Sequence, residues 1–296
     1  MNKEPSWDLY RTFLAVIREG SLSGAARVLG LAQPSVSRHI DTLEEALGTR
    51  LFLRTQRGLA PTDAALELQP YAESLALTSA ALLRAASGNG GDGITGTVRV
   101  SASEVVGVEH LPPILTKLRQ RHPGLEVELV LSNTVDDLLR READVAVRMI
   151  EPQQQALVAR RCGSIALGFH ARADYLARRG TPRTVEDLSG HDLIGFDRET
   201  PAIRAYLSRL NLPARPDFAL RADSDLAQLA FIRAGFGIGM CQVPLGARDP
   251  SLVRVLPDAV SLDLGLWVVM HEDLKTSPRC RAVFDALAEG LSLISG

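Results

Sequence analysis

Residues 20–61 decide the fold: GSLSGAARVLGLAQPSVSRHIDTLEEALGTRLFLRTQRGLAP. In the second half of this stretch, apolar side chains recur at intervals of four, three and four residues, at Val36, Ile40, Leu43 and Leu47. This spacing predicts a helix with one buried stripe. Gly30 comes just before it, where the chain has to turn sharply and glycine accepts the positive φ that such a turn often needs. Ala26 is small enough to let a preceding helix approach closely. The pattern predicts a helix-turn-helix, although a helical hairpin with a solvated face has the same spacing.

A basic hairpin is expected directly after these helices. Gly48 suits a helix end, and RLFLRTQRGLAPT follows at residues 50–62. Leu51 and Phe52 can pack back on the helices, while the residues around Gly58 form a short cationic turn. Such a turn is suited to contact the phosphates of a nucleic acid.

The whole stretch resembles the DNA-binding domain of LysR-type transcriptional regulators. The residues that carry the resemblance are Ala25-Ala26, Leu29, Gln33-Pro34-Ser35-Val36-Ser37-Arg38, Ile40, Leu43-Glu44, Leu47-Gly48, Leu51-Phe52, Arg54 and Pro61-Thr62. The family usually has Ser or Thr at the position of Ala32, so we expect Gln33 to cap the helix, with Pro34 in its first turn. A glycine that the family has after the wing is replaced by Ala64 or Ala65.

The first turns of the second helix enter the major groove in this motif. Gln and Arg side chains can make bidentate contacts to adenine and guanine, and serines suit phosphates or bases. We therefore predict seven DNA contacts: Gln33, Pro34, Ser35, Ser37 and Arg38 on the helix, and Arg54 and Arg57 on the wing. His39 is assigned to DNA or to solvent, and Glu44 and Glu45 to a structural or dimer-facing role.

Composition agrees with a regulator without identifying one. The chain has 296 residues, of which 46% are hydrophobic, enough for two or more domains with a large core. Its net charge is −2, and residues 1–61 hold 8 lysines and arginines against 6 acidic residues. Affinity for DNA therefore has to come from placed groups and from dimerisation rather than from a large positive field.

The expected location is the cytoplasm, with no contact to a membrane. No apolar run approaches the roughly 18 residues that span a bilayer. The N-terminus lacks the layout of a secretory signal. The three cysteines are odd in number and far apart, as in a reduced cytosolic protein.

A linker and a hinge follow the DNA-binding domain, which we place at residues 1–61. Residues 62–87 are rich in Ala and Leu at helical spacing, with Pro70 expected to kink or restart the helix. One helix cannot bury this much apolar surface alone. The resemblance implies antiparallel pairing with a second copy, and the alternative is packing on its own domain. Residues 88–93 are dense in glycine and predict a flexible hinge.

Residues 94–296 alternate between strand-like and helix-like segments, which predicts an α/β domain with a largely parallel sheet. Two lobes fit the pattern: lobe I at about 94–167 and 265–296, and lobe II at about 168–264. This half resembles the effector domain of the same family, which is shaped like a periplasmic binding protein. The expected fold is thus a mainly α winged helix-turn-helix domain with a long linker helix, plus a two-lobe α/β domain.

Ligands of open α/β sheets collect beyond the carboxyl ends of strands. The resemblance implies that the effector cleft uses Ser103, Thr134 and, in members that bind carboxylates, Arg148. We predict six effector-binding residues: Ser101, Ser103, Thr134 and Arg148 from the first lobe, and Phe196 and Ser224 from the second. Helix capping is the alternative role for Thr134 and Ser224, and a solvated strand end for Arg148. Glu104 would repel an acidic ligand unless its side chain points away.

Signatures of catalysis are thin, so no enzyme activity, cofactor or metal is expected. The six histidines show no pair at metal-ligand spacing, and the glycines at 235–239 follow a helix and enter a strand, the reverse of a dinucleotide loop. The resemblance implies a sequence-specific DNA-binding transcriptional regulator that is controlled by a small-molecule effector, with a small organic acid as one candidate. Its expected partners are double-stranded DNA, a second copy in a homodimer that assembles into a homotetramer, and RNA polymerase.

Two alternatives to this function remain open. One is an architectural DNA-binding protein whose cleft is vestigial and filled by large side chains. The other is a cleft enzyme fused to a DNA-binding domain.

Overall fold

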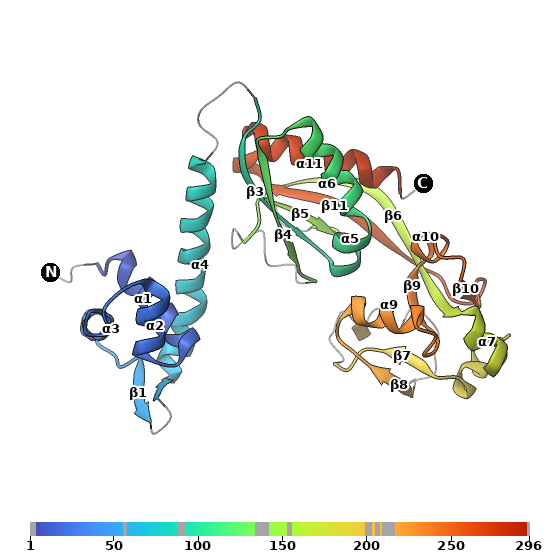
Figure 1. The fold of residues 1–296 in the computed structure, drawn as a ribbon, viewed down its shortest axis with the longest axis horizontal. Helices are drawn as coiled ribbons and strands as arrows, with labels where there is room; N and C mark the ends of the chain where they lie inside the picture. The colour runs from blue at the N-terminus through green and yellow to red at the C-terminus, as the bar shows by residue number, and fades with distance from the viewer. Residues whose placement is uncertain are drawn as a thin grey trace. The chain divides into compact units, whose positions relative to one another are not determined.

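The computed structural model describes residues 4–55, 58–87, 93–133, 142–152, 156–198, 203–204, 208 and 217–294. The chain forms two compact units (Figure 1): residues 1–83 with 140–142, and residues 84–139 with 143–296. Several sequence predictions lie outside the described residues: Arg57, Thr134 and most of the hinge at 88–93.

The first unit is helical with one short β-hairpin. Its elements, including the whole linker helix, are α1 (Trp7–Glu19), α2 (Leu22–Leu29), α3 (Gln33–Leu47), β1 (Phe52–Thr55), β2 (Gly58–Pro61) and α4 (Asp63–Ala86). The core between the first three helices includes Phe13, Val16, Ala26, Val36 and Leu43. Ala26 is buried, as the predicted close approach of α2 and α3 requires. The predicted stripe on α3 is confirmed at its first three positions, but Leu47, in the last turn, is 36% exposed.

The turn between α2 and α3 depends on Gly30. Its φ is +66°, and its N–H donates to the carbonyls of Ala26 and Arg27, which ends α2. Ala32 occupies the N-cap of α3 and offers no side-chain cap, so the expectation that Gln33 caps this helix is wrong. Gln33 is instead the first helical residue, and Pro34 in the first turn lacks an N–H and reduces the number of donors left unsatisfied.

The linker helix α4 continues through Pro70 and does not restart there. Proline removes only one backbone hydrogen bond, and the turns on either side of it are long enough to be helical by themselves. Ala65 and Ala72 of α4 are buried, but many of its large apolar side chains are exposed in the single chain. The exposed ones are Leu66, Tyr71, Leu75, Leu82 and Leu83.

The second unit contains a seven-stranded sheet in the order β10-β6-β11-β5-β3-β4, with β9 also paired to β6. The strands are β3 (Gly96–Ala102), β4 (Leu125–Leu131), β5 (Val145–Arg148), β6 (Leu157–Arg172), β9 (Gly239–Gln242), β10 (Leu252–Val255) and β11 (Leu262–His271). A smaller parallel sheet joins β7 (Leu193–Gly195) and β8 (Phe218–Arg221).

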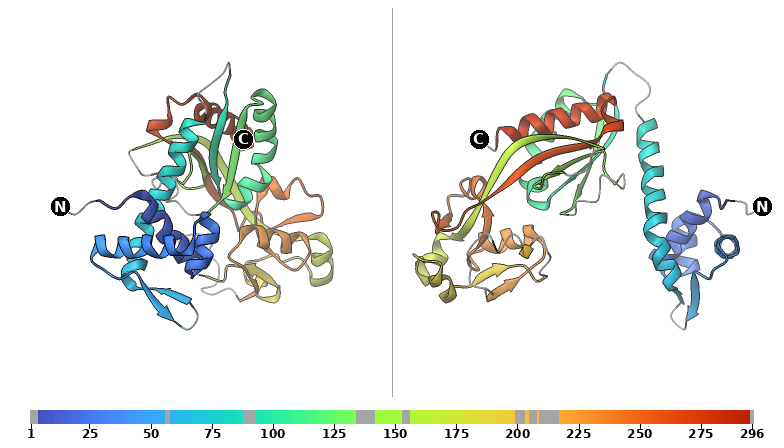
Figure 2. Two further views of the ribbon diagram at one scale, coloured as in Figure 1. Left: turned by 60° about the vertical axis from the view of Figure 1, so that its left-hand side comes forward. Right: turned by 180° about the vertical axis from the view of Figure 1, so that it is seen from behind.

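The large sheet is mixed rather than largely parallel as expected. β3 runs parallel to β4 and β5, whereas β11 runs antiparallel to both β5 and β6. The difference arises from β6, a single strand of 16 residues. Residues 157–167 of β6 pair with β11, and residues 167–172 pair with β9 and β10. β6 and β11 are the two long strands, and both run from one lobe into the other (Figure 2).

Helices complete both lobes. They are α5 (Glu104–Glu109), α6 (Leu111–Arg121), α7 (Ala173–Arg179), α9 (Asp225–Arg233), α10 (Val243–Gly246) and α11 (Pro278–Ser292), with short 3-10 turns η1 (Glu186–Gly190) and η3 (Glu272–Leu274). α6 and α11 lie side by side on one face of the large sheet (Figure 1). Their buried side chains share one core with β3, β5 and β11. Within the described parts of the chain, none of the helices combines the length and the apolarity needed to cross a bilayer.

Candidate functional site

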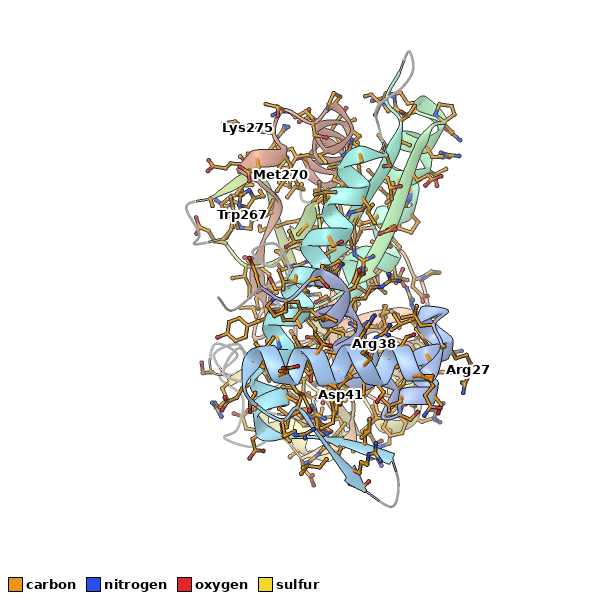
Figure 3. The ribbon with its side chains drawn as sticks, turned by 90° about the vertical axis from the view of Figure 1, so that its left-hand side faces the viewer. Arg27, Arg38, Asp41, Trp267, Met270 and Lys275 are labelled. Atoms are coloured by element: carbon orange, nitrogen blue, oxygen red, sulfur yellow. The ribbon has the colours of Figure 1, made fainter. Side chains whose placement is uncertain are left out.

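The exposed side of α3 carries the residues predicted to contact DNA. Gln33, Pro34 and Arg38 are exposed, and Ser35 and Ser37 are half-buried. They occupy this side because the stripe that begins at Val36 faces the core. Arg38 projects from α3 together with Asp41 one turn further on (Figure 3). The first turns of α3 thus offer an amide and a guanidinium to an approaching DNA groove.

The hairpin β1–β2 is the predicted wing, and it is fixed to the end of α1. Arg54 is exposed on β1, opposite Leu59 of β2. The N–H of Leu59 donates to the carbonyl of Gly20 at 3.0 Å. Gly58 has a φ of +126°, and a Cβ at this position would lie 2.8 Å from the same carbonyl oxygen. Only glycine therefore allows the wing to lie this close to α1.

A buried carboxylate attaches the wing to α3. Glu44 is 7% exposed, and its Oε1 accepts hydrogen bonds from the N–H groups of Leu51 (2.8 Å) and Phe52 (3.2 Å). Its Oε2 forms an ion pair with Arg50 at 2.8 Å. The structural role that we considered for Glu44 is confirmed. The sequence signal for this structural role was the position of Glu44 four residues after Ile40, on the same face of the helix.

The second unit contains a cavity of about 450 Å³ between its two lobes. Three of the predicted effector residues line it: Ser103, Arg148 and Phe196. Sequence reasoning missed most of the lining, because the contributing positions are apolar or amide side chains without a distinctive pattern. The missed residues include Val105, Met149, Gln228, Leu229, Met240 and Gln242, whereas Asn133 and Asp225 adjoin the predicted Thr134 and Ser224 in the sequence and line the cavity.

Arg148 is buried at the end of β5, so the alternative of a solvated strand end is wrong. Its Nη1 donates to the carbonyl of Val147 at 2.9 Å, and its Nη2 donates to the Oγ of Ser101 at 2.8 Å. Ser101 does not line the cavity but orients the guanidinium that does. The positive charge of Arg148 is thus held at the cavity wall by two neutral acceptors.

Glu104 joins the two lobes rather than facing the cavity. Its Oε2 accepts a hydrogen bond from the hydroxyl of Ser224 (2.9 Å) and one from the N–H of Leu226 (3.3 Å). Ser224 also caps α9, since its Oγ accepts from the N–H of Ala227 at 3.3 Å. The capping role considered for Ser224 is confirmed, and its contact with an effector stays a prediction.

Asp225, the first residue of α9, lines the cavity next to this junction. Its Oδ2 accepts a hydrogen bond from the amide of Asn133 in the first lobe at 3.1 Å. Burial, together with the negative charge of Glu104, raises the pKa of Asp225 from 3.8 to about 6, although the amide of Asn133 acts in the opposite direction. The cavity therefore has a positive group at Arg148 and an acid at Asp225.

A second set of contacts joins α5 to lobe II at the other end of the helix. Glu109 pairs with Arg233 at 2.6 Å, and the hydrogen bond from this arginine lowers the pKa of the Glu109 carboxyl. His110, fully buried, lies 2.6 Å from the side-chain oxygen of Gln242, and burial lowers the pKa of its imidazole. The first and last turns of α5 thus both contact lobe II.

The three cysteines have structural rather than reactive roles. Cys162, Cys241 and Cys280 are all buried and unpaired. Burial raises the pKa of Cys241 to about 11, which leaves it a protonated, unreactive thiol at neutral pH. Within the ranges that the structure describes, no three His, Cys, Asp or Glu side chains gather as a metal site would require.

A winged helix-turn-helix with an exposed basic face, and a two-lobe α/β domain with a cavity, define a class of ligand-responsive DNA-binding proteins. Comparison with known families gives the same result. Residues 7–66 match the family described as "Bacterial regulatory helix-turn-helix protein, lysR family", and residues 91–292 match the "LysR substrate binding domain". The chain belongs to the family of LysR-type transcriptional regulators.

Relatives show the same organisation. The HTH-type transcriptional regulator CrgA of Neisseria meningitidis is 32% identical over 188 residues, which is 62% of this chain and 61% of that protein. The match thus spans less than two thirds of that relative. The probable HTH-type transcriptional regulator LtrA of Klebsiella pneumoniae is 28% identical over 94% of this chain and 92% of its own length. A solved structure of CrgA has a TM-score of 0.60 at 26% identity, covering 98% of this chain and 99% of CrgA.

Proposed function

We propose that this protein binds a specific DNA sequence as a homo-oligomer and regulates transcription in response to a small molecule bound between its two lobes. The observation that carries this proposal is the side of α3 with Gln33 and Arg38 exposed opposite the buried stripe. The wing adds Arg54, which is held at its place through the contacts of Glu44 and Gly58. Arg38 would contact a guanine edge, and Arg54 a phosphate.

Assembly as a homodimer would cover the exposed apolar side chains of α4. Leu75, Leu82 and Leu83 lie on one helix that has few buried residues of its own. A second copy of α4 offers matching apolar surface. Two such dimers would form a homotetramer, which could then contact RNA polymerase at a promoter. Family membership supports action in the cytoplasm, without enzyme activity.

The cavity supports the control of this activity by an effector. A volume of about 450 Å³ counts against the alternative of a filled, vestigial cleft. Arg148, oriented by Ser101, offers a charge-assisted hydrogen bond to a carboxylate, and Ser103 and Phe196 would complete the contacts. A ligand that binds one arrangement of the lobes better than another would shift the population of DNA-binding states.

The test is a selection of bound sequences from a random DNA pool by the full chain, followed by affinity measurements with Arg38→Ala. If Arg38 contacts a base, the variant should lose about 1–3 kcal/mol of specific binding, roughly 5- to 150-fold, with little change on unrelated DNA. Arg121→Ala, an exposed arginine at the end of α6, is the matched control. A wild-type protein that enriches no sequence would refute the proposed function, and an unchanged affinity of Arg38→Ala would remove this residue from the base-contacting face.

A further inference from the structure

The wall of the cavity is mainly apolar. Aliphatic and sulfur-containing side chains from both lobes form most of it, among them Val105, Met149, Leu167, Leu229 and Met240. Its volume of about 450 Å³ falls within the range of roughly 300–1,000 Å³ that small organic ligands occupy in proteins. The main part of a fitting ligand is therefore apolar, and the few polar groups in the wall determine which polar groups the ligand has.

Most of these polar side chains already bond to the protein. Asn133 uses both ends of its amide, and Gln228 and Gln242 are engaged with protein atoms. Two groups differ. Among the residues that the structure describes, the buried hydroxyl of Ser103 has no hydrogen-bond partner, and no hydrogen bond reaches the Oδ1 of Asp225. Both residues line the cavity, so a ligand can supply what they lack.

Asp225 has surroundings that favour a positive partner. Its carboxyl group lies in a largely apolar wall, and the neighbouring Glu104 is a second negative charge. Glu104 itself is satisfied, since it accepts hydrogen bonds from Ser224 and Leu226. The raised pKa of Asp225, about 6, still leaves most molecules ionised at pH 7. A cation at Oδ1 would offset both the burial of this carboxylate and its repulsion by Glu104.

On the premise of the function proposed above, we propose that the effector is an apolar small molecule with a protonated amine, which forms an ion pair with the carboxylate of Asp225 inside the cavity. Arg148 lines the same cavity and binds an acceptor, such as a carboxylate, on the same molecule. The hydroxyl of Ser103 adds a hydrogen bond to either polar group. The ligand class is thus an amphoteric molecule with an apolar body, rather than a simple organic acid.

The test compares three probes that share one skeleton and differ only in their polar end: 3-phenylpropylamine, 3-phenylpropan-1-ol and 3-phenylpropanoate. Binding to the full chain is measured by titration calorimetry at pH 7.5. We expect wild-type protein to bind the amine at least tenfold more tightly than the alcohol. Asp225→Asn should remove this preference and leave the affinity for the alcohol nearly unchanged. Asp217→Asn, at a fully exposed carboxylate of the same lobe, should retain it.

Equal affinities of wild-type protein for the amine and the alcohol would overturn the inference, as would an amine preference that survives in Asp225→Asn. Binding of the alcohol or the propanoate without the amine would also overturn it, yet would leave an effector cleft in place. If none of the probes binds, the inference fails, and the DNA selection then decides the proposed function separately. Circular dichroism verifies that Asp225→Asn is folded, and Asp225→Ser, which keeps a polar side chain at the helix start, serves as a second variant.

Discussion

Replacing Asp225 with Asn should stabilise the second unit, by an amount that depends on pH. The folded protein holds the pKa of this carboxyl at about 6 instead of 3.8, because burial and Glu104 disfavour the charge. At about 1.36 kcal/mol per pH unit, this difference corresponds to a cost of about 3 kcal/mol for ionising Asp225 in the folded state. Asparagine keeps the shape and hydrogen-bonding ability of the side chain and removes the charge.

The sign of the pH dependence follows from proton binding. Because the folded state binds this proton more tightly than the unfolded state, the stabilising effect of the neutral acid is fully present below pH 3.8. It is lost as the pH rises to about 6, and above this value the full cost remains. The advantage of Asp225→Asn over wild type should therefore grow between pH 4 and about pH 6 and stay constant at higher pH.

The assay is urea denaturation of the full chain at pH 4, 5, 6, 7 and 8. Trp267 lies on β11, so a Trp7→Phe background isolates the fluorescence signal of the second unit. Asp217→Asn in the same background should show no such growth, because that carboxylate is fully exposed. A difference between Asp225→Asn and wild type that is constant across this range, or that shrinks as the pH rises, would refute the assigned environment of Asp225.

Three further outcomes are expected. Glu44→Ala should destabilise the first unit by about 2–4 kcal/mol in urea denaturation, because the N–H groups of Leu51 and Phe52 lose their buried acceptor. Glu44→Gln keeps an acceptor oxygen and should destabilise the unit less. Equal losses of stability in the two variants would argue against the hydrogen bonds. Arg148→Met should weaken the binding of 3-phenylpropanoate at least tenfold in titration calorimetry and spare DNA affinity, and unchanged binding would place the anion subsite elsewhere. Leu82→Glu should shift sedimentation toward the monomer without changing the helical content, and a persistent dimer would exclude this face of α4.

The helix-turn-helix could be predicted from the sequence almost residue by residue, since its information is local. The positions of Val36, Ile40 and Leu43 define the buried side, and Gly30 marks the turn. Leu47 was mispredicted because periodicity does not show where a helix stops being covered by its neighbours. The capping prediction failed for a related reason, because the residue types around Ala32 do not reveal which one is the first to be helical.

The cavity was harder to predict, because it depends on contacts between residues far apart in the sequence. Ser103, Arg148 and Phe196 were found, since they follow strands or match a family position. The pKa of Asp225 is raised mainly by its burial in the cavity wall and further by Glu104, more than a hundred residues earlier, and no local pattern reports either cause. The antiparallel pairing of β6 with β11 was likewise hidden, since hydrophobic alternation does not indicate strand direction.

The two long strands also set the order in which the protein can fold during synthesis. β3 leaves the ribosome early, but its sheet is not complete until β11 at 262–271 and α11 at 278–292 have been made. Most of lobe II, by contrast, lies between β6 and β11 in the sequence and can start to fold first. At about 5–20 residues per second, synthesis from β3 to the end of α11 takes on the order of 10–40 seconds, and the apolar face of the incomplete sheet stays uncovered during this time. A nascent chain stalled before residue 262 should therefore be a substrate for chaperones, and one released after residue 292 should not.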